Sequence, residues 1–267
     1  IGALGGMACA QGVSVSNFVV PYHSYMYDYW GNAVPTPQAY LSSLVIKGES
    51  LGIGALKDPS DLCVSENGNI YIADTGNDRI ICLDPEWGVL QVISTFHNGD
   101  TEDSLKGPKG VYITSTEKLY VADTTNGRIV HFDADGKYVR IIGPPKSDID
   151  GVLPERFIYR PLRVGVDGHG RIYVISQDLP EGFIAFSEAG EFRGFTGAPR
   201  VYPNLADYIW RRLATKEQRE RMRVCLPTEY SGLDLDEDGF IYATSIDEDS
   251  DDYEGGVAVK IRKLNPK

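Results

Sequence analysis

Hydrophobic and polar residues alternate in short segments that recur four times along the chain. The clearest copies are Asn69 to Ile81 (NIYIADTGNDRII) and Lys118 to Val130 (KLYVADTTNGRIV). In each copy, β-branched and aromatic residues predict a half-buried strand, and the Gly, Asn and Asp residues that follow predict a tight turn into a second strand. Each copy is therefore a predicted β-hairpin. Weaker copies lie at Arg171 to Ser176 (RIYVIS) and Phe240 to Ser245 (FIYATS).

The repeat extends upstream of each hairpin. When the copies are aligned on their tyrosines, three of them have a proline twelve residues earlier, and apolar residues recur nine and seven positions before the tyrosine. This period-2 alternation predicts a strand that opens each unit. A closing fourth strand is predicted at residues 88–95, 137–142 and 191–196. The aligned tyrosines are Tyr71, Tyr120, Tyr173 and Tyr242, and the prolines are Pro59, Pro108 and Pro161.

Units of four short antiparallel strands are typical of the blades of a β-propeller. The intervals between the four tyrosines are 49, 53 and 69 residues, which suits blades of this kind. We therefore predict an all-β fold, a β-propeller of four-stranded antiparallel blades over residues 43–267. Residues 43–48 resemble the end of a fourth strand that would complete the last blade. Four repeats leave two alternatives open: a four-bladed ring, or part of a six-bladed ring in a longer chain.

The long interval before the fourth copy contains a predicted helical insertion at about residues 199–227. Asn204 is the expected N-cap of the helix. Leu205, Ile209 and Leu213 are spaced so that they share one helix face. The insertion connects the last strand of one blade to the first strand of the next. Such connections lie on the face where propellers usually bind ligands, so we expect the insertion to flank a binding face.

Residues 1–42 read as a signal-peptide remnant followed by an aromatic leader. Ala8 and Ala10 have the small-residue spacing of a cleavage site, which predicts a secreted or cell-surface protein. No segment has the roughly 20 apolar residues of a membrane span. The leader either packs across the propeller and buries its aromatic side chains, which we favour, or stacks on a sugar or a protein partner. These side chains are Phe18, Tyr22, Tyr25, Tyr27, Tyr29 and Trp30.

Composition excludes one common class of function. The chain of 267 residues has 26 basic and 38 acidic residues, a net charge of −12. Nucleic-acid binding requires a basic surface, so we do not expect a nucleic-acid partner. The four cysteines lack metal-ligand spacing. Cys63 and Cys82 fall on the first and third strands of one predicted blade, too far apart for a disulfide.

A polar set recurs after each of the two clear tyrosines. An aspartate precedes an arginine by five residues, with an asparagine between them. Aspartate and asparagine stabilise turns, and a guanidinium can join neighbouring strands. Because the set occurs once per blade, whereas catalytic groups converge on one place, we predict a structural role. Its members are Asp74, Asn77 and Arg79 in the first copy and Asp123, Asn126 and Arg128 in the second.

The positions just after each repeat proline are the ones expected near the central channel. We predict that ligand contacts come from Ser60, Lys109, Arg163, Glu229 and Tyr230. This set is mixed in charge and does not predict a metal site, so we expect no catalytic residues and no cofactor.

The segment Asp234 to Gly239 (DLDEDG) resembles the opening of a calcium loop. The twelfth position is Ser245 instead of the glutamate that a complete loop needs. Ordinary turn formation therefore explains these aspartates better than calcium binding does.

The two clear copies resemble a known family. The pattern P-x-x-L/V-x-V/I, followed by Y-I/V-A-D-T-x-N-x-R-I, resembles the NHL repeat, whose fold is a β-propeller that is usually six-bladed. The leader and the insertion resemble secreted NHL-repeat proteins of Gram-positive bacteria. The resemblance implies a non-enzymatic, extracytoplasmic module that binds a protein or a glycan. The alternative is a metal-dependent propeller enzyme of the lactonase or amidating-lyase type, with ligands around the channel.

Overall fold

The computed structural model describes residues 25–36, 45–147, 153, 157–177, 179, 182–197, 230–247 and 258–265. The chain divides into two compact units, residues 1–56 and 57–267. The insertion expected at about residues 199–227 and the signal-peptide region lie outside the described residues. In the part of the chain that is described, no helix combines the length and apolar character needed to cross a membrane.

The first unit contains a two-stranded hairpin formed by β1 (Tyr25–Tyr27) and β2 (Ala33–Pro35). Asp28 shapes its turn, because one carboxylate oxygen accepts hydrogen bonds from the main-chain N–H groups of Trp30 and Asn32, each at 2.8 Å. The aromatic side chains of this hairpin are exposed within the unit. Two strands of three residues have too few positions to enclose a core. Residues 45–48 form no strand, so the fourth-strand prediction fails for the described part of residues 43–48.

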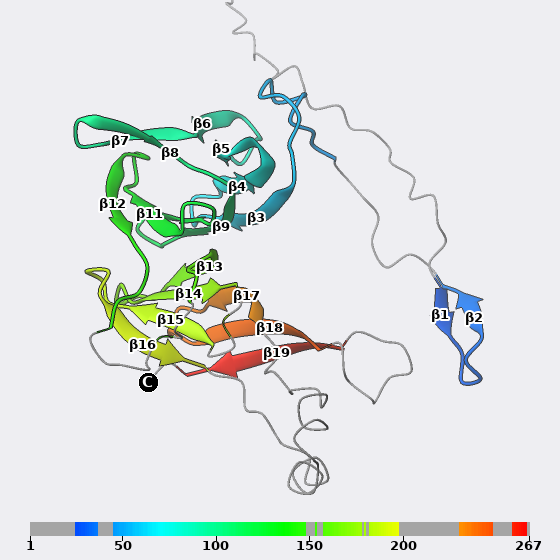
Figure 1. Ribbon diagram of the computed structural model, residues 1–267. Coiled ribbons are helices and arrows are strands. Elements are labelled where there is room, and N and C mark those ends of the chain that lie inside the picture. Colours follow the sequence, from blue (N-terminus) through cyan, green and yellow to red (C-terminus); the bar gives the residue numbers. More distant parts are fainter. Residues whose placement is uncertain are drawn as a thin grey trace, which may run out of the picture. The chain divides into compact units, whose positions relative to one another are not determined.

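The second unit is a four-blade β-propeller (Figure 1). This confirms the predicted all-β fold. Three blades contain four antiparallel strands in sequential order, and the fourth blade contains three described strands. Blade one consists of β3 (Pro59–Val64), β4 (Ile70–Asp74), β5 (Arg79–Leu83) and β6 (Val89–Ile93), with a 3-10 turn, η1 (Thr75–Asn77); blade two of β9 (Pro108–Ile113), β10 (Leu119–Asp123), β11 (Arg128–Phe132) and β12 (Tyr138–Ile142); blade three of β13 (Pro161–Val166), β14 (Ile172–Ser176), β15 (Phe183–Phe186) and β16 (Phe192–Thr196); blade four of β17 (Tyr230–Leu235), β18 (Ile241–Asp247) and β19 (Ala258–Leu264).

The first strand of every blade is the innermost one. These strands, β3, β9, β13 and β17, lie nearest the centre of the propeller (Figure 1), and their residues line a central channel. Gly110 lies at a close approach of blades two and three. A Cβ atom at this position would lie 2.5 Å from the carbonyl oxygen of Leu162 and 3.0 Å from the Cα atom of Arg163. Only glycine fits there without moving one blade.

The hydrophobic core lies between the blades. Side chains alternate across each sheet, so every blade has two faces available for packing. Tyr71 and Ile80 on one face of blade one pack with Val111 and Val121 of blade two. The same arrangement joins blades two and three and then blades three and four. Each interface therefore combines the outgoing face of one blade with the receiving face of the next.

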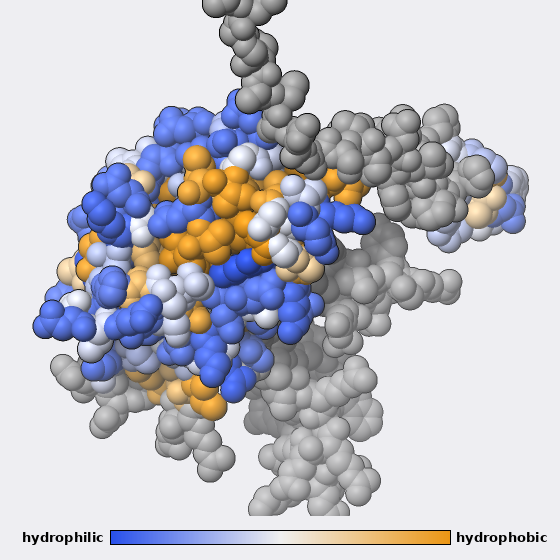
Figure 2. All heavy atoms as spheres, turned by 90° about the horizontal axis from the view of Figure 1, so that it is seen from above, coloured by the Kyte–Doolittle hydropathy of each residue, from blue (hydrophilic) through white to orange (hydrophobic). Residues whose placement is uncertain are grey.

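The receiving face of blade one is exposed at its inner strand, whereas Ile81 and Leu83 on the same face are buried. Leu62 on this face has 63% of its surface accessible, whereas Val111, which holds the same register position in blade two, has 4%. The register is defined by the pairing of Leu62 with Ile72 and of Val111 with Val121. Figure 2 shows a broad apolar patch on the side of the molecule where blade one lies. The same residue pattern is thus buried in one blade and exposed in another.

An additional hairpin, β7 (Thr95–Asn98) and β8 (Thr101–Ser104), lies between blades one and two. The repeat pattern does not predict it. Asp103 in this hairpin binds the guanidinium of Arg128 through both carboxylate oxygens, at 2.6 and 2.9 Å. The sequence signal for it is Gly99-Asp100, a combination favoured in two-residue hairpin turns.

Cys63 and Cys82 are free thiols, which confirms the prediction that they form no disulfide. They lie on β3 and β5, which are separated by β4. Burial raises the pKa of Cys63 to about 12. The reactive form of a cysteine is the thiolate, so this thiol is unreactive near neutral pH.

His131 is a buried histidine on β11 of blade two. Its ring stacks on that of Tyr120, with centroids 4.3 Å apart and planes 5° from parallel. Neither ring nitrogen has a hydrogen-bond partner among the described residues. Burial, with a further contribution from the Arg140 guanidinium, lowers the pKa of His131 to about 4. The folded protein therefore keeps this ring neutral.

We expect His131 to make the propeller sensitive to mild acid. In the unfolded chain it takes up a proton near pH 6.5, whereas the folded chain resists protonation until about pH 4. The stability due to the neutral ring is thus complete above pH 6.5 and is lost as the pH falls toward 4, by about 2–3 kcal/mol. Urea denaturation of the wild type and of His131→Phe across this range measures the effect. The variant keeps the aromatic stack and should lose less stability on acidification; equal slopes for the two proteins would contradict the prediction.

Candidate functional site

The central channel contains two adjoining cavities of about 390 and 440 Å³. They share Val64, Tyr112 and Ile113 as lining residues, so they are consecutive parts of one channel. The larger cavity lies between the inner strands. The smaller one, here called the turn-side cavity, lies where these strands end, and the turn that follows each of the four contributes to its wall.

Arg163 occupies the proline end of the channel, where the inner strands begin. Its Nη1 donates to the main-chain carbonyl of Lys109 at 2.6 Å, and its Nη2 donates to that of Ser60 at 3.1 Å. The structure therefore brings together three of the five residues predicted near the channel. Ser60 and Lys109 participate through the main chain, so the guanidinium acts as a bridge between blades one, two and three.

Asp61 lies beside this bridge. One of its carboxylate oxygens accepts the N–H of Val111 at 3.0 Å and lies 3.8 Å from Nε of Arg163. Burial raises the pKa of Asp61, and the nearby guanidinium partly opposes this shift. The repeat alignment does not single out Asp61, because the corresponding residue of blade two is a glycine, Gly110.

The other two predicted channel residues differ in outcome. Glu229 lies outside the described residues. Tyr230 is buried between blades three and four: its ring stacks on Phe183 at 4.8 Å, and its hydroxyl donates to the carbonyl of Gly197 at 2.8 Å. The channel position predicted for Tyr230 is therefore wrong. In the strand register, Tyr230 lies opposite Ser245, just as Pro59 lies opposite Asp74. Tyr230 therefore occupies the position of the repeat proline.

The repeated polar set forms a clamp within each of the first two blades. The carboxylate of Asp123 is fully buried. Its Oδ1 accepts the N–H of Lys106 at 2.7 Å. Its Oδ2 accepts hydrogen bonds from Nδ2 of Asn126 at 2.9 Å and from Nε of Arg128 at 2.7 Å. The clamp ties the segment before the blade to the turn inside it.

Blade one repeats this clamp with nearly the same distances. Asp74 accepts the N–H of Lys57 at 2.7 Å, Nδ2 of Asn77 at 2.8 Å and Nε of Arg79 at 2.7 Å. The partners of the buried carboxylate all belong to the propeller framework. These contacts describe a structural set.

A threonine follows each clamp aspartate and joins one blade to the next. The hydroxyl of Thr75 donates to the carbonyl of Pro108, and that of Thr124 donates to the carbonyl of Pro161, both at 2.6 Å. Sequence reasoning missed this role, although both partners belong to the repeat. The sequence does contain a signal for this role. A threonine follows the aspartate in blades one and two, and in both cases the next blade begins with the repeat proline.

Blade three keeps part of the clamp with a different side chain. Ser176 occupies the aspartate position, and its Oγ accepts the N–H of Arg160 at 3.1 Å. This matches the contacts of the aspartates with Lys57 and Lys106. In blade three a hydroxyl thus supplies the acceptor that a carboxylate supplies in blades one and two.

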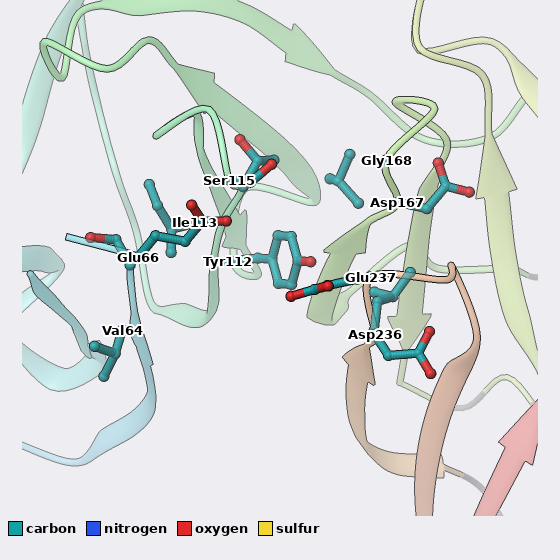
Figure 3. A pocket seen from close by; sticks show the side chains of 13 residues that line it. Val64, Glu66, Tyr112, Ile113, Ser115, Asp167, Gly168, Asp236 and Glu237 are labelled. Atoms are coloured by element: carbon teal, nitrogen blue, oxygen red, sulfur yellow. The ribbon is translucent and has the colours of Figure 1, made fainter. Parts of the chain in front are cut away.

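The turn-side cavity is polar at its rim. Glu66, Ser115 and Glu237 lie on the turns after β3, β9 and β17, and Tyr112 lies near the end of β9, before the turn that carries Ser115 (Figure 3). The carboxylate of Glu237 extends toward the ring of Tyr112, and Glu66 approaches from the opposite side (Figure 3). Burial and nearby acidic groups raise the pKa of Tyr112 to about 12, so its hydroxyl stays neutral.

Two other carboxylates of this rim are engaged by their own turns. Asp167 accepts Nε of Arg171 at 2.7 Å and the hydroxyl of Tyr173 at 3.2 Å. Asp236 accepts the N–H of Phe240 at 2.8 Å and lies 3.3 Å from Nζ of Lys263. In the described ranges, no group of three or more His, Cys, Asp or Glu side chains is arranged to hold a metal ion.

Together, the fold and its channel define a β-propeller. Two of its blades carry NHL repeats: residues 56–83 and 105–132 match the family model of the NHL repeat. The matched segments cover the first three strands of blades one and two. The predicted resemblance to NHL repeats is confirmed for these two copies.

Comparison with solved structures gives similarity at the level of the fold. A streptogramin B lyase has a TM-score of 0.42 and 13% identity over 90% of this chain and 61% of that chain. A virginiamycin B lyase from Staphylococcus aureus has 0.43 and 12% over 88% and 61%. A gluconolactonase from Xanthomonas campestris has 0.45 and 16% over 90% and 64%. The chain thus spans less than two thirds of each of these structures. No curated protein matches the sequence.

Proposed function

We propose that this propeller is a non-enzymatic binding module that takes part of a protein or glycan ligand into the turn-side cavity. In this proposal the ligand contacts the rim formed by the turns after the inner strands. This is the end of the channel opposite to the one expected from the sequence, where the repeat prolines lie. A location outside the cytoplasm is part of the proposal and rests on the Ala8-x-Ala10 pattern.

The observation that carries the proposal is a difference between the two ends of the channel. At the proline end, Arg163 binds the carbonyls of Ser60 and Lys109. At the turn side, Glu66 and Glu237 line a cavity of about 390 Å³ and have no partner among the described residues. Concave sites with a few convergent polar groups are the usual places for ligand binding.

A variant that closes the rim tests the proposal. Ser115 is exposed on the turn after β9, so Ser115→Trp fills the rim without disturbing the core. Ala189→Trp, in the exposed turn between β15 and β16, adds the same bulk away from this cavity. We expect the wild type and Ala189→Trp to bind the same members of a glycan array and a peptide array, and Ser115→Trp to lose about tenfold or more in affinity.

Two results would overturn this proposal. One is unchanged binding by Ser115→Trp, which would put the ligand elsewhere. The other is stoichiometric bound metal together with turnover of a substrate, which would make the protein an enzyme. Circular dichroism of both variants should match the wild type, because both positions are exposed turns.

A further inference from the structure

From the lining of the turn-side cavity we infer the ligand class: a basic side chain, the ammonium of a lysine or the guanidinium of an arginine, presented by a protein partner. This inference rests on the proposed binding function and makes it more specific. It depends on three features of the cavity: the charge of the rim, the apolar floor and an unsatisfied hydroxyl in the wall.

The rim carries negative charge from opposite sides. Of the 13 residues that line the cavity, four are carboxylates and none is Lys, Arg or His. Asp167 and Asp236 already interact with Arg171 and Lys263. Glu66 and Glu237 have no such counterion among the described residues. They come from blades one and four and approach the ring of Tyr112 from opposite sides (Figure 3).

The floor beneath this rim is apolar. The last residue of each inner strand contributes one aliphatic side chain to the cavity. A lysine or arginine side chain matches this arrangement of apolar floor and polar rim. Its aliphatic stem packs on apolar surface, while its charged head stays with polar groups. The ring of Tyr112 adds a face on which a cation can rest. The four aliphatic residues are Val64, Ile113, Val166 and Leu235.

One hydroxyl in the wall lacks a partner. Ser65 has 6% of its surface accessible, and its Oγ makes no hydrogen bond with the described residues. Ser65 lines the same cavity, next to Glu66. Buried hydroxyls are normally hydrogen-bonded. A ligand group with several N–H donors would satisfy this oxygen as well as the two glutamates.

The arrangement suits an organic cation better than a metal ion. In the described part of the chain, no three acidic or metal-ligating side chains converge on one point. The negative charge is instead distributed around a space of about 390 Å³. An ammonium or guanidinium donates in several directions and binds such separated acceptors, whereas calcium requires six to eight close oxygens.

The test uses a fluorescent peptide of alternating lysine and glycine, with a counterpart in which glutamine replaces lysine, in anisotropy titrations of the whole chain. The key variant is Glu66→Gln with Glu237→Gln. We expect it to bind the lysine peptide about tenfold more weakly than the wild type, because charge-assisted hydrogen bonds are lost. Tyr112→Leu should bind about three- to tenfold more weakly, since the cation loses its aromatic face.

A matched control separates this site from the overall acidity of the chain. Glu86→Gln with Glu102→Gln changes the net charge equally, at exposed positions that do not line the cavity. We expect this control to bind within about twofold of the wild type at about 150 mM salt.

Equal weakening in the control and the key variant would overturn the inference, because diffuse attraction to an acidic protein would explain the binding. If the glutamine peptide bound as tightly as the lysine peptide and Ser115→Trp abolished this binding, the inference of a cationic ligand would be wrong. The proposed binding function would still stand. If neither peptide bound, and the ligands found on the arrays still bound to Ser115→Trp, the proposed function itself would be wrong.

Discussion

Replacement of Asp123 with alanine is expected to lower the free energy of unfolding by about 2–4 kcal/mol, because Nε of a largely buried arginine loses its acceptor, although both Nη atoms keep their contacts with Asp103. Arg128 has 14% of its side-chain surface accessible, and the carboxylate of Asp123 has none. The variant also removes the acceptor for the Lys106 N–H, which then has no partner at the entry to blade two. Equilibrium denaturation in urea measures the loss.

The matched control for this prediction is Asp135→Ala. Asp135 also pairs with a basic residue, Lys137, at 3.6 Å, but its side chain is 77% exposed. Exposed ion pairs contribute little, so we expect a change of less than about 0.5 kcal/mol. Asp123→Asn should fall between the two, because it keeps an acceptor and loses the charge. A loss at Asp123 no larger than that at Asp135 would show that the clamp does not support the fold.

A polar side chain at one repeat position should have very different effects in two blades. Val111→Asn places an amide in the packed interface between blades one and two, and we expect a loss of about 2–4 kcal/mol. Leu62→Asn changes the equivalent position of blade one, which is 63% exposed, and should cost less than about 1 kcal/mol. Urea denaturation of the two variants measures this difference.

The comparison tests the packing of the blades directly. Both positions lie on inner strands and pair with the equivalent residue of the second strand, so their local structure is the same. Only the presence of a neighbouring blade differs. Similar losses for Leu62→Asn and Val111→Asn would mean that the receiving face of blade one is covered in solution.

The repeat accounts for both the fold and its local irregularities. The clamp at Asp74 and Asp123 closes each blade internally, and Thr75 and Thr124 connect each blade to the next. Blade three lacks this threonine, and its contact with blade four instead uses the stacking of Tyr230 on Phe183. The loss of motif residues in the later copies thus coincides with a different way of joining blades.

Short-range pattern was sufficient for the strands, the turns and the blade order. The closing strands predicted at residues 88–95, 137–142 and 191–196 appear as β6, β12 and β16. Such features depend on alternation and turn chemistry within a few residues, which the sequence displays directly. The hairpin β7–β8 was missed because it lies between repeats, where alignment of the copies gives no information.

Three-dimensional packing alone decided which polar groups meet at each end of the channel. The reach of Arg163 to the carbonyls of Ser60 and Lys109 depends on where blades one and two lie. Glu66 and Glu237 are far apart in the chain and share a cavity only because their inner strands end on the same side. Residue types and spacing therefore determine a propeller with repeated clamps, whereas the free polar groups of a site follow from how separate blades converge. Contacts between side chains of different blades join residues far apart in the sequence, so a local sequence pattern does not predict them.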